Sequence, residues 1–91
     1  MELTDANKEK IETLIGRWGV SLQLLITMEQ CSQLSTECSH WMRWSNNQSK
    51  LVERMADMQI MIQTLQQVFG VQDAELQNVI DKKLEEALKK K

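Results

Sequence analysis

Apolar side chains recur every three or four positions along most of this chain, and this spacing constrains its fold more than any other feature. Two stripes follow it: Leu24, Met28, Cys31, Leu34, Cys38 and Trp41, and then Leu51, Met55, Met58, Ile62, Leu65 and Phe69. Such spacing puts the apolar residues on one side of an α-helix, where they form a core. The chain also has no proline, three glycines and 4% aromatic residues, which favours helix over sheet. We therefore expect an all-α protein.

Glycines and polar residues divide the chain into four expected helices, over positions 5–17, 21–44, 49–69 and 73–90. Thr4 or Asp5 caps the first helix, and Gly16 and Gly19 mark its end. A polar turn occupies positions 45–49. Gly70 ends the third helix and Asp73 caps the fourth. The apolar side of the fourth helix carries Leu76, Val79, Ile80, Leu84, Ala87 and Leu88. Because the later connections are short, we expect antiparallel neighbours in a four-helix protomer.

The length of 91 residues predicts a single domain over 1–91, with a core that is marginal for a chain folding alone. We therefore expect a homo-oligomer. The net charge of −2 gives no basic surface for DNA or RNA. The lysines near the end fit the carbonyl end of a helix macrodipole. With no signal peptide and no apolar run of membrane-spanning length, we expect a cytoplasmic protein.

Cys31 and Cys38 lie seven positions apart on one expected helix, about 10 Å along its axis at ~1.5 Å per residue. That is too far for a disulfide, so both are expected to be small core residues. Cys38 and His40 are two positions apart and diverge by roughly 160° around the helix. They therefore predict neither a zinc site nor a catalytic Cys–His pair.

From Ile11 to Leu88 the chain resembles the MazG-like nucleoside triphosphate pyrophosphohydrolases, in their short phage and bacterial form. The segments that carry the resemblance are Arg17-Trp18-Gly19, Glu29-Gln30-Cys31-Ser32-Gln33-Leu34, Glu53-Arg54-Met55-Ala56-Asp57-Met58, Phe69-Gly70, Asp73 and Lys83-Leu84. The family reads Glu-Glu-x-x-Glu-Leu in the first long helix and Glu-Glu-x-Ala-Asp-Val in the next. The resemblance implies an all-α bundle and Mg²⁺-dependent release of pyrophosphate from nucleotides. It also implies dimers or tetramers, in which two protomers associate through the expected helices 21–44 and 49–69 into a larger bundle.

The family motif has a physical reason, because acids three positions apart on a helix point the same way and Mg²⁺ prefers oxygen ligands. Two such pairs on facing helices hold metal ions that polarise the triphosphate and activate water. By position, the four ligand sites are Gln30, Gln33, Arg54 and Asp57. Only Asp57 is an acid, and Arg54 brings a fixed positive charge. The resemblance therefore implies a pseudoenzyme without the magnesium site, so no cofactor is expected.

We expect Arg54 to pair with Asp57 one turn along, or with Glu29 across the bundle. Two interpretations of this pair stay open. In the first, the pair is a polar patch that only maintains the fold. In the second, Arg54 binds a nucleotide phosphate. Trp41 and Trp44 lie where family aromatics stack on the base; Trp41 is expected to pack in the core, and Trp44 is the better stacking candidate.

Three functions stay open. The first is a catalytically silent protein that binds a nucleotide-type ligand or a protein partner. The second is an active Mg²⁺-dependent enzyme that uses Asp57 with Glu53, Glu29 and Glu37. The third is a structural helical oligomer without a ligand.

Overall fold

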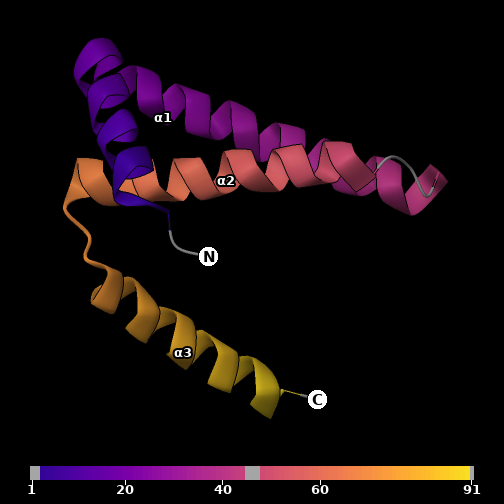
Figure 1. Ribbon diagram of the computed structural model, residues 1–91. Helices are drawn as coiled ribbons and strands as arrows, with labels where there is room; N and C mark the ends of the chain where they lie inside the picture. Colours follow the sequence, from indigo (N-terminus) through magenta and orange to yellow (C-terminus); the bar gives the residue numbers. More distant parts are fainter. Residues whose placement is uncertain (1–2, 45–47, 91) are drawn as a thin grey trace.

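The computed structural model describes residues 3–44 and 48–90, and the secondary structure in these ranges is helical throughout (Figure 1). The helices are α1 (Asp5–Trp44), α2 (Gln48–Phe69) and α3 (Asp73–Lys89). The all-α prediction is confirmed. Three helices are labelled where four were expected, because the first two expected helices form the two parts of α1 on either side of a kink at Gly19. Positions 45–47 of the predicted turn lie outside the described residues, and 48 and 49 belong to α2.

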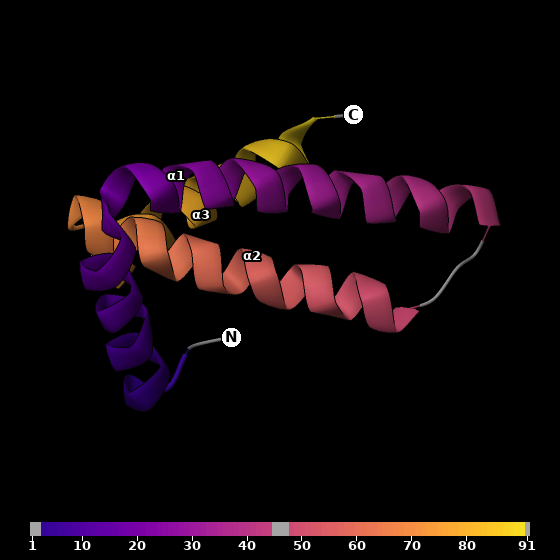
Figure 2. The same cartoon turned by 90° about the horizontal axis from the view of Figure 1, so that it is seen from above.

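Gly19 divides α1 into two helical parts that meet at a kink. Its dihedral angles, φ 80° and ψ 167°, are not helical, and the residues on either side of it, from Asp5 and up to Trp44, are. The positive φ is open to glycine at little cost because glycine has no Cβ. The segment before Gly19 consequently stands at a steep angle to the rest of α1 (Figures 1 and 2). The predicted break was therefore placed correctly in sequence, but a single residue makes it.

The two longest helices form an antiparallel hairpin, in which the part of α1 after Gly19 runs beside α2 in both views (Figures 1 and 2). Fully buried side chains in the described residues are few: Ile11, Gln23, Met61 and Thr64. Less exposed positions continue along the hairpin on α1 as Ile26, Thr27, Gln30, Gln33, Leu34 and Glu37, and on α2 as Leu51, Arg54, Asp57, Met58, Leu65 and Val68. We call these and Gln23, Met61 and Thr64 the seam.

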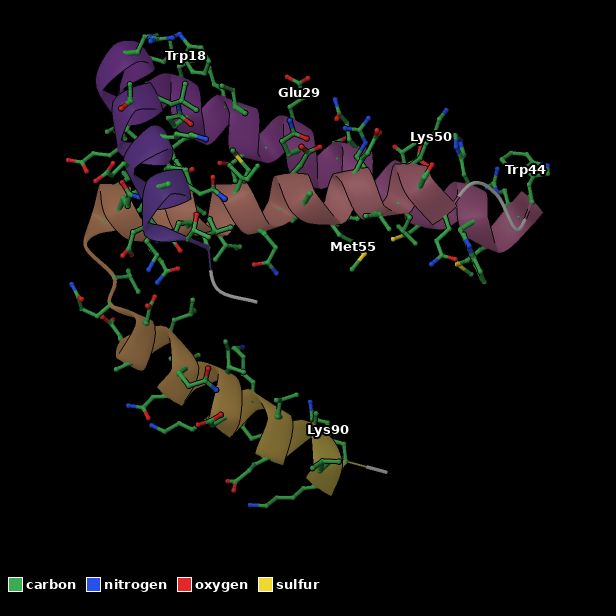
Figure 3. All side chains as sticks on the ribbon, in the orientation of Figure 1. Trp18, Glu29, Trp44, Lys50, Met55 and Lys90 are labelled. Carbon is green, nitrogen blue, oxygen red and sulfur yellow. The ribbon has the colours of Figure 1, made fainter. Side chains whose placement is uncertain are left out.

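The predicted apolar stripe of the first long helix is mostly outside the seam. Met28 is 68% exposed and Trp41 48%, and both cysteines are exposed, so their prediction as core residues is wrong. Met55 from the second stripe is also exposed, and Figure 3 shows it pointing away from α1. The physical reason is that a two-helix hairpin buries only one stripe of each helix. Here that stripe is partly polar, and much of the apolar surface faces outward.

The structure confirms some of the predicted helix caps and contradicts others. Thr4 caps α1, because its hydroxyl oxygen accepts a hydrogen bond from the backbone N–H of Asn7 at 3.1 Å. Gly70 follows α2 with φ 68°, as predicted. The cap predicted at Asp73 is wrong: Gln72 is the N-cap and makes no side-chain capping bond. The Asp73 carboxylate instead accepts a hydrogen bond from the side chain of Gln66 at 2.8 Å.

The last helix, α3, diverges from α2 after the Gly70 turn (Figure 1). In the described part of the chain it does not pack along α1 or α2, so its prediction as an antiparallel neighbour is wrong. Its apolar side is open, with Leu84 59% and Leu88 86% exposed. None of the described helices is both long and apolar enough to cross a membrane.

Candidate functional site: the polar seam between α1 and α2

All four family-equivalent positions lie in the seam. Gln30 and Gln33 come from α1, Arg54 and Asp57 come from α2, and all four are half-buried. The register of the hairpin follows from the Thr27 hydroxyl, which contacts Met61 Sδ at 3.5 Å. In an antiparallel pair, each step forward on α1 meets a step backward on α2. Gln30 therefore lies level with Asp57 and the next residue, Met58, and Gln33 lies close to the level of Arg54.

An ion pair occupies the α2 side of this site. Arg54 Nη1 donates to Asp57 Oδ2 at 2.9 Å, and the two side chains are 30% and 31% exposed. This is the i, i+3 pairing expected from the sequence. At this exposure the pair contributes little stability, about 1 kcal/mol or less, because water screens both charges. Its larger effect is chemical, since the guanidinium engages Asp57, which is the one carboxylate among the four positions singled out by the resemblance.

The α1 side of the site is uncharged. Gln33 Nε2 donates to Glu29 Oε1 at 3.2 Å. Glu29 is exposed, and Figure 3 shows it on the side of α1 away from α2. Among the described residues Glu29 thus accepts a bond from Gln33, and the alternative pairing of Arg54 with Glu29 is not seen. Gln30 Oε1 is buried without a hydrogen-bond partner in the described chain.

Buried polar side chains continue along the seam beyond the four predicted positions. Gln23 is 3% exposed and Thr64 is 2% exposed. The hydroxyl of Thr64 donates to the Ile60 carbonyl at 2.8 Å, whereas Gln23 Nε2 has no partner in the described chain. Sequence reasoning missed these residues. The available signal was their spacing, since Gln23 precedes Gln30 by seven positions and Thr64 follows Asp57 by seven.

The seam does not fit magnesium. In the described ranges, no group of three or more His, Cys, Asp or Glu side chains is arranged to hold a metal ion. Asp57 is already bound by a guanidinium, and Glu53 is exposed outside the seam. Mg²⁺ requires several oxygen ligands in near-octahedral geometry, which the engaged Asp57 carboxylate and the two amides do not supply. The other carboxylate of the seam, Glu37, lies 3.9 Å from His40 Nδ1.

The tryptophans lie elsewhere on the hairpin. Trp44 ends α1 at the far tip and is 62% exposed (Figure 3). It contacts the His40 ring edge-on, with centroids 5.4 Å apart, and the Arg43 guanidinium lies 5.9 Å from its ring centroid. Trp44 is ten or more positions beyond the level of Arg54, roughly 15 Å along the helix. The structure therefore does not bring the predicted stacking residues Trp41 and Trp44 together with Arg54 and Asp57.

Two open grooves lie at the opposite end of the hairpin, lined by the first segment of α1, the end of α2 and the start of α3. Their volumes are about 470 and 450 Å³, and Lys8, Gln63, Gln66 and Asp73 line both. Neither groove contains any of the predicted site residues. Compared with known proteins, the chain matches no protein family, no curated protein and no solved structure.

Proposed function

We propose that this protein is a catalytically silent MazG-like homologue that acts by binding a protein, in an oligomer of its own chain. The observation that carries the proposal is the Arg54–Asp57 ion pair within a seam whose other family-equivalent positions are amides. In such a seam the positive charge that magnesium supplies to the family is replaced by a guanidinium. Arg54 does not lose its proton in a protein, so this charge is permanent.

The chemistry available to the seam supports a silent site. Pyrophosphate release needs a metal to polarise the phosphates and to activate water. A metal entering this seam would have to separate the pair between Arg54 and Asp57 and would then gain one carboxylate. A phosphate group approaching Arg54 would meet the Asp57 charge 2.9 Å from the guanidinium. Both observations favour the interpretation of the seam as a structural patch.

The exposed surface supports a binding role. A compact monomer of 10.6 kDa exposes about 5,500 Å², whereas this protomer exposes 7334 Å², roughly 1,800 Å² more. Obligate interfaces bury about 1,000–2,500 Å² on each partner, so the excess is of the size that a permanent interface covers. The exposed surface includes apolar side chains on all three helices that a partner could cover, among them Leu25, Met28, Met55, Ile62, Leu84 and Leu88. Surfaces of this composition favour a protein partner over a nucleotide.

The proposal is tested by two measurements on the full chain. Pyrophosphate release from a panel of nucleoside triphosphates, with Mg²⁺ or Mn²⁺, should stay at the background level. Turnover that disappears in Asp57→Ala would overturn the silent site and favour the active alternative.

Sedimentation equilibrium provides the second measurement and should show a dimer or larger assembly. A monomer at every concentration would overturn the oligomer. Thermal shift with the same nucleotides separates the binding classes, because a bound ligand raises the melting temperature with its concentration. We expect no change in melting temperature. A saturable rise would show that the chain binds a nucleotide and would favour a nucleotide ligand over a protein partner.

A further inference from the structure

One line of exposed residues on α1 has the spacing of a coiled-coil seam. It consists of Leu24, Met28, Cys31, Ser35, Cys38 and Met42, which we call the outer stripe. Successive members are separated by four, three, four, three and four positions, the alternation that helices use when they pack along their length. All six are exposed, from 36% at Leu24 to 83% at Met42. The stripe is therefore a helix-packing surface that no other described part of the chain covers.

The outer stripe also lacks charge. The acids of this part of α1, Glu29 and Glu37, occupy other sides of the helix, because they are out of phase with the stripe by roughly 100° or more. Two identical surfaces brought together usually suffer like-charge repulsion, and here that cost is absent. The residue sizes add a second property. Leu24, Met28 and Met42 are large and lie toward the ends, whereas Cys31, Ser35 and Cys38 are small and lie toward the middle.

We propose that the outer stripe packs antiparallel against the same stripe of a second copy of this chain. This rests on the self-association in the proposed function and adds its face, direction and register. With the two-fold axis at position 33, Leu24 lies opposite Met42 of the second copy, Met28 opposite Cys38, and Cys31 opposite Ser35. The side chains in the central layers are then small, so the two helices can approach closely there. The side chains in the end layers are large and pack over the two ends of the interface.

Two features favour the antiparallel direction. Parallel copies would align the macrodipoles of two long helices, whereas antiparallel copies oppose them. The bend at Gly19 also matters, because it turns the first segment of α1 away from the axis of the hairpin. In a parallel pair both bent segments would lie at one end of the interface. In an antiparallel pair they lie at opposite ends and leave the stripe clear.

A matched pair of substitutions tests the face. Ser35→Glu puts a charge in the central layer, and Thr36→Glu puts the same charge on a neighbouring exposed position outside the stripe. By sedimentation equilibrium, Ser35→Glu should weaken self-association at least tenfold and Thr36→Glu should leave it unchanged. Circular dichroism of both variants checks that they stay helical, which we expect. Equal effects of the two substitutions would overturn the outer stripe as the interface.

Disulfide trapping tests the direction. In a background with Cys31→Ser and Cys38→Ser, one chain carries Leu24→Cys and another carries Met42→Cys. The antiparallel register predicts a disulfide between the two different chains after mixing and mild oxidation. Each variant alone should give almost none, because its cysteines would be 18 positions apart along the axis, about 27 Å.

Each result of the trapping experiment decides a separate question. Disulfides formed by each variant alone would show a parallel pair and overturn the register. An assembly that gives no disulfide in any mixture would overturn the stripe while leaving self-association intact. A monomer would overturn self-association itself. None of these results depends on pyrophosphate release, so the silent site is judged separately.

Discussion

Restoring the family carboxylates should create a magnesium site in the seam. The perturbation is the triple change Gln30→Glu, Gln33→Glu and Arg54→Glu, with Asp57 kept. In the present seam the Arg54 and Asp57 charges cancel. Each glutamine replacement adds one negative charge and the arginine replacement adds two, so the four positions go from neutral to −4. The whole chain goes from −2 to −6 by the same count.

The cost without metal follows from the spacing of the four acids. Neighbours three positions apart on a helix are about 6 Å apart, where two like charges repel by about 3 kcal/mol at an effective dielectric near 20. Partial exposure lowers this to roughly 1–2 kcal/mol for each of the two pairs. Loss of the Arg54–Asp57 bridge adds up to about 1 kcal/mol. The triple variant should thus lose about 2–5 kcal/mol of its unfolding free energy without metal.

Magnesium should return much of this stability, because it binds only where the four carboxylates converge. At a concentration 100 times the dissociation constant, a ligand that binds only the folded state adds about 2.7 kcal/mol. For a domain of this size that raises the melting temperature by roughly 10–20 °C. The assay is thermal unfolding with Mg²⁺ against EDTA, supported by calorimetric titration.

A control for general charge effects carries Gln77→Glu, Asn78→Glu and Lys82→Glu on the exposed α3, the same change of −4. Its response to Mg²⁺ should be small. If the seam variant folds and responds no more than this control, the assignment of the four positions to one site is wrong.

Four further outcomes follow from single features. Gln23→Met removes a buried Nε2 that has no partner in the described chain, and should stabilise the protein by about 1 kcal/mol in urea denaturation. Gly19→Ala forces a side chain onto a residue with φ 80° and should lower the unfolding free energy by about 1–2 kcal/mol. Gly16→Ala, in open space within the helix, should raise it by roughly 0.5–1 kcal/mol. Equal effects of the two substitutions would contradict the bend at Gly19. Thr4→Ala should lose about 1 kcal/mol by removing the cap on Asn7, and Thr4→Ser should retain it. The melting temperature of the unaltered chain should rise with protein concentration, and a constant value would argue against assembly.

Helix positions could be predicted from the sequence because they depend on local signals. The spacing of apolar residues placed α2 and α3 within a residue of their observed ends. Gly19 and Gly70 marked changes of direction because a positive φ is easy for glycine. The steep angle between the two parts of α1 could not be predicted in the same way. It depends on the φ and ψ that Gly19 adopts, which the residue types alone do not determine.

The buried face could not be predicted from apolar spacing. Leu24 and Met28 have the stronger apolar signal, yet Gln23 and Thr27 lie one position away and are the less exposed pair. A one-position shift rotates a helix face by about 100°. The pattern shows that a face is apolar, but not whether it is covered within the protomer or by another chain. For the site, the motif spacing did succeed in grouping Gln30, Gln33, Arg54 and Asp57, whereas nothing in the spacing revealed that Trp44 lies at the far tip.

The partly polar seam and the apolar exterior have one common consequence. Among the described residues only Ile11 and Met61 are apolar and fully buried, so the hairpin gains little hydrophobic stabilisation from its own interior. The Arg54–Asp57 pair adds little, because it is partly hydrated. Apolar side chains that are scarce in the interior are instead exposed on the outer stripe of α1 and on α3. Covering those faces removes apolar surface from water at the same moment that it holds the hairpin and α3 in place. On the proposed self-association, folding and assembly would form one coupled equilibrium. Substitutions on exposed positions such as Met28 should then affect stability more than their exposure in the single chain suggests.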